Sequence, residues 1–567
     1  MKKILLQFAI FLVSATSFIF AQGTAKQKTI NISGNIGLFY DMYDFSEENY
    51  PNFRAKYPEN LFRLNANATI QLGKHFSIPF GINITNQKTL YNLPNLPNES
   101  IVDYIQNPKN NISIHPKYKW VQAHIGTHTP DYSELSTGDI NIFGAGLDLN
   151  PGKFIFSFNY GISQRAIEQD NLLNTVGAYA QNIIATRIGF GKIDGSKFTI
   201  NIVKIEDDVT SLINAPTEIK PIEGITIAPL IEVKFGKKIF FTTETAVSIF
   251  TSNLLNPFEI DNEIVDAVKD IITINASSKG DFSHKSSLEW KSKKLTLGGE
   301  VKYIGPGFVP AGFRNIEKDI LDYKFKSSIK LFKGKTNING MFGIRTNNLK
   351  NTTLQSTKRI ISNLNVFTKL TKKLSLNASY SNFGFNNNEI NNVLRIEMIN
   401  NTYNVSPSYK FKTTSINHLI SLNWNLNNFD QFDTTSSSFV ASQSKSYGLN
   451  YNLFFKNMPL NINLMGLHLN NQTPASSFKM KNYSASFSYK FYDKKIKPTL
   501  LFNLAQISKN PFTTDKRFST KLKISYKINK KLQFKFAYKL NKYTYGTSRP
   551  NALTKENRLQ FSLLKKF

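Results

Sequence analysis

The sequence predicts an all-β fold, namely one large antiparallel transmembrane β-barrel of about 24–26 strands with short periplasmic turns and long extracellular loops. Three observations favour this fold: runs that alternate apolar and polar residues, tight turns that recur along the chain, and an amphipathic last strand that ends at Phe567. Successive side chains of a strand point to opposite faces, so each run has one lipid-facing and one water-facing side.

The composition agrees with a barrel. The 567 residues include 46 Phe and 24 Tyr, and only 19% of the residues are charged. The mean hydropathy of −0.28 is too polar for a bundle of membrane helices, but it fits strands that are apolar at alternate positions. Cysteine is absent, which excludes disulfides, thiolate catalysis and zinc–thiolate sites.

The N-terminus predicts export. Two lysines precede an apolar run that ends at Phe20, and Ala21 stands at a plausible cleavage point, an order typical of a secretory signal peptide. The short stretch that follows leaves no room for a plug domain before the first strand. We assign residues 1–21 to the signal peptide, 22–28 to a short periplasmic lead-in and 29–567 to a single transmembrane β-barrel. Both ends of the mature chain are then expected in the periplasm.

The alternation is strict in several runs. It is clear in 30–42 and in its expected partner 62–72, and it returns in 154–162 and 532–540. Period two over about ten residues, bounded by turn formers, is the pattern of a transmembrane barrel strand.

Tight turns divide the chain into hairpins. In five of them a polar residue and two lysines precede the Leu or Ile that opens a strand. Others use turn formers such as Pro151 and Gly152, because proline presets φ and glycine accepts positive φ. The turns are expected near 73–74, Pro116, 150–153, 194–197, 237–238, 293–294, 333–335, 372–373, Thr413, Asn457, 494–495 and 530–531. Twelve turns require thirteen longer loops on the opposite side and 26 strands.

The final strand is predicted to close the barrel. Its apolar face is formed by Leu559, Phe561, Leu563 and Phe567. An amphipathic strand that ends the chain in Phe resembles the C-terminal signal by which outer-membrane β-barrels are recognised for insertion.

A second resemblance is local. The stretches 115–120 and 144–153 resemble a segment of poorly characterised, porin-like outer-membrane barrels of Bacteroidota. This resemblance implies a Gram-negative outer-membrane location but no activity. It also implies outer-membrane lipid and lipopolysaccharide as surroundings, the barrel-assembly machinery as a partner during insertion, and a plug or surface protein as a further candidate partner.

The net charge of +31 raises the question of nucleic-acid binding. The lysines crowd the tight turns, whereas the acidic residues crowd expected loops such as 206–208 and 259–270. Lysines spread around a rim do not form the basic face that nucleic acid requires, so no nucleic-acid partner is expected.

Two charged sets are predicted to face the lumen. The basic stripe comprises Arg517, Lys521, Lys523, Lys527, Lys535, Lys539 and Arg558. Cationic linings select anions, although a wet barrel wall also carries charge without any function. The mixed-charge wall comprises Glu232, Glu244, Glu289, Glu300, Lys285 and Lys302. It is interpreted either as a docking wall for an inserted loop or plug, or as a ladder of cross-strand ion pairs worth about 0.2–1 kcal/mol each.

Neither a metal site nor a catalytic site is predicted. His124 and His128 precede Asp131, but strand residues four apart are separated by about 13 Å, too far to share one zinc ion. There is no nucleophile elbow, P-loop or dinucleotide fingerprint, so neither an enzyme nor a cofactor is expected. Apolar residues at helical intervals in 257–274 predict a short helix over the mouth or inside the lumen.

Two functions remain open. The first is a porin or channel, with anionic solutes suggested by the basic stripe. The second is the barrel component of an outer-membrane secretion, biogenesis or surface-adhesion assembly, in which a partner fills or caps the lumen. A large girth without a plug favours the second function, because open barrels of that size leak.

Overall fold

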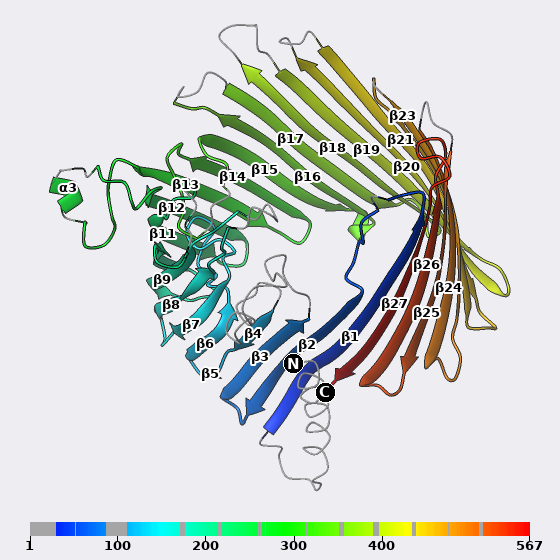
Figure 1. Cartoon of the computed structure of the whole chain (residues 1–567), viewed down its shortest axis with the longest axis horizontal. Coiled ribbons are helices and arrows are strands. Elements are labelled where there is room, and N and C mark those ends of the chain that lie inside the picture. The colour runs from blue at the N-terminus through cyan, green and yellow to red at the C-terminus, as the bar shows by residue number, and fades with distance from the viewer. Residues whose placement is uncertain are drawn as a thin grey trace.

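The computed structural model shows a closed antiparallel barrel with almost no helix (Figure 1). It describes residues 30–51, 53–86, 110–169, 176–213, 215, 218–258, 260, 263–266, 268–312, 316–350, 356–388, 396–433, 438–474, 476–509 and 514–567. The predicted signal peptide and lead-in lie outside these residues. Within them, no helix is long and apolar enough to cross a membrane.

One 27-stranded sheet contains all the strands that the described residues form. In the first half these are β1 (Ile30–Glu48), β2 (Asn60–Leu72), β3 (Phe76–Thr85), β4 (Asn111–Ile114), β5 (Lys117–Tyr118), β6 (Val121–His128), β7 (Ile142–Leu149), β8 (Phe154–Gln164), β9 (Ala180–Gly191), β10 (Lys197–Asp208), β11 (Glu223–Phe235), β12 (Ile239–Thr251), β13 (Ser278–Lys291) and β14 (Leu295–Ile304). In the second half they are β15 (Ile320–Leu331), β16 (Thr336–Asn347), β17 (Ser356–Lys369), β18 (Leu374–Asn388), β19 (Ile396–Lys412), β20 (Ile416–Asp433), β21 (Ser438–Phe455), β22 (Leu460–Gln472), β23 (Ser477–Tyr489), β24 (Ile496–Lys509), β25 (Asp515–Lys527), β26 (Leu532–Thr544) and β27 (Leu553–Lys566).

Two of these strands share one position in the barrel wall, and we call each such strand position a stave. β4 and β5 both pair with β3 on one side and with β6 on the other, and each pairing keeps a single register across the break. The 27 strands therefore make 26 staves, which confirms the predicted fold class.

The turn expected at Pro116 is wrong. The chain reverses instead at Lys119, whose φ is 52°, and at Trp120. Through the break, the amide of His115 still donates to the carbonyl of Pro79 (2.8 Å), and the carbonyl of Pro116 accepts from the amide of Ala123 (2.9 Å). Because proline lacks an N–H group, it removes one ladder hydrogen bond without turning the chain.

The barrel closes where the last strand meets the first (Figure 1). β27 pairs with β1 so that Phe561 lies opposite Tyr40 and Leu563 opposite Leu38. Beyond the strand, Phe567 and Gly34 exchange two backbone hydrogen bonds of 3.2 Å. Closure leaves no strand edge unpaired, which is the condition for a sheet to cross a bilayer.

The register assigns the two faces of every stave. Large apolar side chains are exposed on the outward face, for example Tyr160, Ile188, Leu288, Phe325, Leu422 and Tyr483. Polar residues dominate the inward face. An apolar outer band around a polar interior is the arrangement of membrane barrels.

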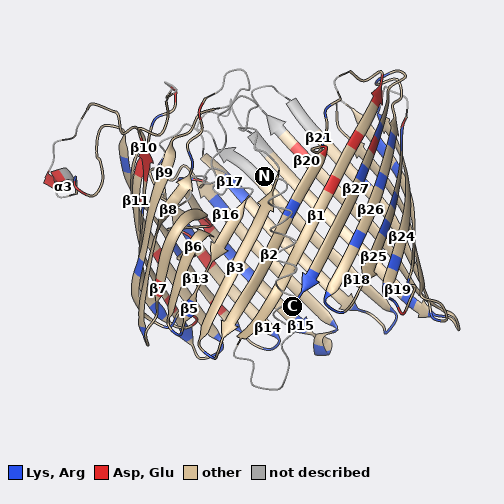
Figure 2. Cartoon of the chain, turned by 60° about the horizontal axis from the view of Figure 1, so that its bottom comes forward, with Lys and Arg blue, Asp and Glu red and all other residues tan. Residues whose placement is uncertain are grey.

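The two ends of the barrel differ in charge and in the length of their connections. Lys and Arg gather at the turn end, and acidic residues are frequent at the loop end (Figure 2). The loops are long in the first half of the chain, whereas β20 and β21 are joined by only 434–437 and β22 and β23 by only 473–476. The longest of the predicted loops are therefore concentrated in the first half of the chain.

Two long loops fold against the inner wall. Lumen loop 1 (129–141) joins β6 to β7, and lumen loop 2 (305–319) joins β14 to β15. Tyr132 of loop 1 packs with inward residues of β9 and β10, and Leu135 packs with Phe308 of loop 2 and with inward residues of β11 and β12. The loops also touch each other: a Cβ on Gly312 would lie 2.3 Å from the carbonyl oxygen of Ser136. Their apolar side chains give this side of the lumen a small hydrophobic core.

The helix expected in 257–274 is short and lies elsewhere. α3 (Glu263–Asp266) projects beside the wall near β11 to β13, not over the lumen (Figures 1 and 2). The returning chain is tied to the rim, because Thr273 donates its amide to Glu223 (2.9 Å). Lumen loops 1 and 2 already occupy the inner face of this part of the wall, which leaves the outer side for the segment.

Candidate functional site in the barrel lumen

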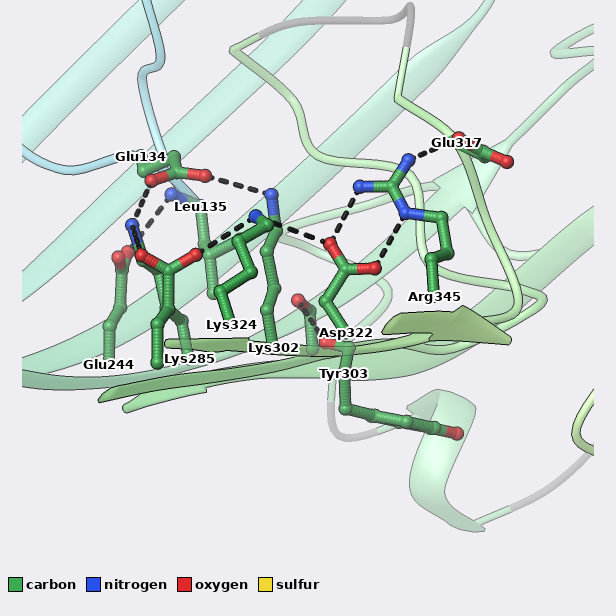
Figure 3. A network of polar contacts seen from close by, with 12 residues as sticks. Glu134, Leu135, Glu244, Lys285, Lys302, Tyr303, Glu317, Asp322, Lys324 and Arg345 are labelled. Carbon is green, nitrogen blue, oxygen red and sulfur yellow. Dashed lines mark hydrogen bonds and ion pairs between the residues drawn. The ribbon is translucent and has the colours of Figure 1, made fainter. Parts of the chain in front are cut away.

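Lumen loop 1 is anchored by one carboxylate. Glu134 accepts hydrogen bonds from the ammonium groups of Lys285 and, at 2.8 Å, of Lys302, which are cross-strand partners on β13 and β14 (Figure 3). Burial alone would raise the pKa of Glu134, but the two lysine hydrogen bonds outweigh it and lower the pKa to about 2. The loop carboxylate is therefore ionised and pairs with both adjacent cations, offsetting one of their two charges.

A backbone contact strengthens this anchor. The amide of Leu135 donates to the Oε1 of Glu244 (3.2 Å), and both residues are buried. Since a buried amide without a partner costs about 1–3 kcal/mol, Glu244 holds the loop at a fixed depth on the wall.

Lumen loop 2 is anchored in the same manner. Glu317 pairs with Arg345 and, at 3.0 Å, with Arg359, which stand on β16 and β17. Arg345 also makes two hydrogen bonds of 2.6 Å to Asp322, the fork-like pairing that suits guanidinium and carboxylate (Figure 3).

The two anchors belong to one network. Lys324 lies 3.0 Å from Glu300 and 3.4 Å from Asp322, and Glu300 lies 3.9 Å from Lys285. Charges of opposite sign therefore alternate along β13 to β17, from the anchor of loop 1 to the anchor of loop 2 (Figure 3).

The mixed-charge wall faces the lumen, but its members are not all in one place. Glu244, Glu300, Lys285 and Lys302 surround the anchor of lumen loop 1. The remaining two members form separate pairs near the turn end: Glu232 lies 3.1 Å from Lys197, and Glu289 pairs with Lys291.

The basic stripe also faces the lumen, and its central members are contiguous. Lys539 lies opposite Lys521 on one side and opposite Arg558 on the other. Arg558 is neutralised by Asp41 of β1 (2.9 Å). The structure gives the other members no carboxylate partner within the part of the chain that it describes: Arg517, Lys521, Lys523, Lys527, Lys535 and Lys539. Arg63 of β2 lines the same hollow as Lys521 and adds a further cation.

Sequence reasoning missed the partners supplied by loops and by closure. Alternation placed Asp41 and Arg63 on the lumen face, but only the β1–β27 pairing brings them beside the stripe. Glu134 and Glu317 lie in segments without periodicity, so no sequence pattern marked them.

Three histidines lie together on the wall near lumen loop 1. The rings of His124 and His128 stack with centroids 5.3 Å apart, much closer than a regular strand predicts, because Gly126 between them has a φ of 89°. His124 contacts His115 (2.9 Å) and Asp148 (2.9 Å). Among the described residues, no group of three or more such side chains is arranged to hold a metal ion.

Comparison with known proteins yields distant structural likenesses. No family model and no curated protein matches the chain. The translocation pore of the P pilus usher PapC is 7% identical with a TM-score of 0.34, over 95% of this chain and 100% of that one. Acinetobacter baumannii OccAB2 is 12% identical with a TM-score of 0.31, over 61% and 92%. Pseudomonas aeruginosa OpdK with vanillate is 9% identical with a TM-score of 0.29, over 61% and 93%.

Proposed function

We propose that this chain is an integral outer-membrane β-barrel that acts as a channel for anionic solutes. The observation that carries the proposal is the basic stripe, whose lumen cations, apart from Arg558, have no carboxylate partner in the described residues. The apolar outward faces and the closed ring of backbone hydrogen bonds support the membrane location.

Among the described residues, the lumen is filled mainly on the side of lumen loops 1 and 2, although the β1–β2 loop also reaches inward, where Tyr57 lies against Arg558 and Lys56 pairs with Glu556. Inward residues beside lumen loops 1 and 2, such as Thr199, Asn201 and Ser248, are 0% exposed. On the opposite wall, β20 is exposed on both faces: Asn423 is exposed toward the lumen, and Trp424 is exposed on the outer face. No described loop therefore covers the inner face at Asn423. A barrel of 26 staves is wide enough to keep a water-filled passage beside such loops.

Charge pairing supports the preference for anions. The cations beside the lumen loops are each paired with a carboxylate, namely that of Glu134, Glu300, Asp322 or Glu317. Apart from Arg558, the members of the stripe have no such partner in the described residues, and the stripe lies away from lumen loops 1 and 2. A cationic lining raises the local concentration of anions and lowers that of cations.

The test is the reversal potential of purified protein in a planar bilayer under a KCl gradient. The expected current is carried mainly by chloride. The triple variant Lys521→Gln, Lys523→Gln, Lys539→Gln shifts the reversal potential toward that of a non-selective pore. The matched control changes Lys445, Lys479 and Lys481 to Gln; the register places these three on the outward face, so selectivity is kept. A cation-selective wild-type current contradicts the proposal.

A second candidate is a barrel component of a surface assembly. The observation that favours it is the outer loop (252–277), where Leu255, Phe258 and Ile271 are 61%, 71% and 52% exposed beside the wall. Apolar side chains exposed in this way mark surfaces that bind other molecules. Absence of current, together with proteins that co-purify from solubilised outer membranes and are lost in Phe258→Ser, would support this candidate over the channel.

A further inference from the structure

One wall of the lumen is uncharged through its middle. Among the described residues, the inward positions of β18 to β23 carry mainly Asn, Ser and Thr, with an apolar group of Met465, Leu467, Leu469 and Met480 on β22 and β23, and the charged residues stand near the strand ends, at Lys410 and Lys412. We call this surface the amide wall. Representative members are Asn404, Asn425, Ser446, Asn450, Asn463 and Ser484.

Neighbouring side chains of the amide wall hold one another in place. The side-chain amide of Asn463 donates to Asn450 (2.6 Å) and to Asn452 (2.7 Å). On β19 and β20, the hydroxyl of Ser406 donates to the side-chain oxygen of Asn423 (2.7 Å). An amide has two donor hydrogens and two acceptor lone pairs, so capacity remains after these bonds form. Asn425 has no side-chain hydrogen bond within the described part of the chain. The wall therefore presents oriented donors and acceptors without net charge, and hydroxyl groups, which both donate and accept, match such an array.

An aromatic ring lies at the border of this polar surface. Phe383 of β18 faces inward, is 40% exposed and lies between Ile361 of β17 and Asn400 of β19. The face of an aromatic ring is negatively polarised and attracts weakly positive C–H bonds. A sugar ring offers both C–H faces and hydroxyl edges, so this combination suits carbohydrate better than a simple ion.

The amide wall adjoins the basic stripe. β24 lies between them, with Thr499 opposite Lys523 and Asn503 opposite Ser519. Staves are about 4.8 Å apart, so a few sugar units span the distance from β22 to β25. A solute on this part of the lumen meets groups that bind hydroxyls and groups that bind anions at the same time.

We infer that the lumen binds and passes acidic oligosaccharides, with their hydroxyl groups on the amide wall and their carboxylate or sulfate groups on the basic stripe. This inference rests on the proposed channel function and names its substrate class.

The experiment measures block of the bilayer current by three probes. Trigalacturonate carries carboxylates and hydroxyls, maltotriose carries hydroxyls alone, and tricarballylate carries carboxylates alone. If each surface contributes one or two hydrogen bonds or ion contacts, trigalacturonate should block at about tenfold lower concentration than either of the others.

Two matched variants separate the surfaces. The inward pair Asn404→Ala and Asn425→Ala should weaken block by trigalacturonate about fivefold and leave the reversal potential in KCl unchanged. The control pair Asn382→Ala and Asn401→Ala removes a hydrogen-bonded Asn pair (2.7 Å) from the outward face of adjacent staves. It should change neither property.

The outcomes distinguish this inference from the function on which it rests. Equal block by tricarballylate, or by an acidic peptide such as oligoglutamate, overturns the carbohydrate class while an anion-selective current leaves the channel intact. If maltotriose blocks at the same concentration as trigalacturonate, the basic stripe does not bind the acidic groups, and the inference of an acidic substrate is overturned. Absence of current, or a cation-selective current, rejects the channel function itself.

Discussion

Replacement of Glu134 by Gln should release lumen loop 1 from the wall. The substitution keeps the size of the side chain but removes the negative charge that pairs with Lys285 and Lys302. A pKa lowered from 4.5 to about 2 corresponds to about 3 kcal/mol, but the side chain is 47% exposed, and screening reduces this to about 1–2 kcal/mol. The detached population of the loop should then rise about 5- to 30-fold.

The absence of cysteine makes this population measurable. Ser136 of lumen loop 1 is 0% exposed, so a thiol in Ser136→Cys reacts with a water-soluble maleimide only when the loop leaves the wall. The labelling rate in the Glu134→Gln background should exceed the rate in the native background about 5- to 30-fold. Glu289→Gln is the control, because Glu289 pairs with Lys291 away from the loop. Equal rates with and without Glu134 would show that the apolar packing of Tyr132 and Leu135 holds the loop without the ion pairs.

Three further predictions concern the same wall. Because the pKa of Glu134 is lowered in the folded protein, its stabilisation of the attached loop is complete above pH 4.5 and is lost as the pH falls toward 2. Loop detachment, measured as single-channel current noise, should therefore rise between pH 5 and 3 in the native protein but not in Glu134→Gln. Arg345→Gln leaves Asp322, 1% exposed, without its guanidinium, and should cost about 3 kcal/mol in the free energy of unfolding in detergent, whereas Lys326→Gln costs under about 1 kcal/mol. Gly126→Ala places a Cβ 2.0 Å from the carbonyl oxygen of Ile112 at a φ of 89°, and should lower the heat-modification temperature on gels. Gly299→Ala is the control, because its Cβ meets nothing within 4 Å and its backbone lies outside the left-handed region.

The faces of the staves could be predicted from the sequence because the period of two depends only on local geometry. Alternation placed Arg558 and Lys539 on the water-facing side and Phe561 on the lipid-facing side, and the register agrees. The reversal near Pro116 could not be predicted to the residue, because a proline interrupts a ladder whether or not the chain turns there.

The positions of the loops could not be predicted. Glu134 and Glu317 meet their cations only because Tyr132, Leu135 and Phe308 find apolar positions on the inner wall, and these contacts join residues far apart in the chain. The stacking of His124 on His128 depends on one glycine whose backbone conformation no pattern reveals.

The one-sided placement of the lumen loops has a mechanical consequence. The staves from β9 to β17 are braced from within by loop packing and ion pairs, whereas in the described residues those from β18 to β26 are joined by strand pairing and by side-chain contacts between neighbouring strands. We expect the braced arc to behave as a stiff frame and the other arc to bend when lateral pressure in the bilayer changes. Any widening or flattening of the bore would then take place along the compliant arc, which carries both the amide wall and the basic stripe.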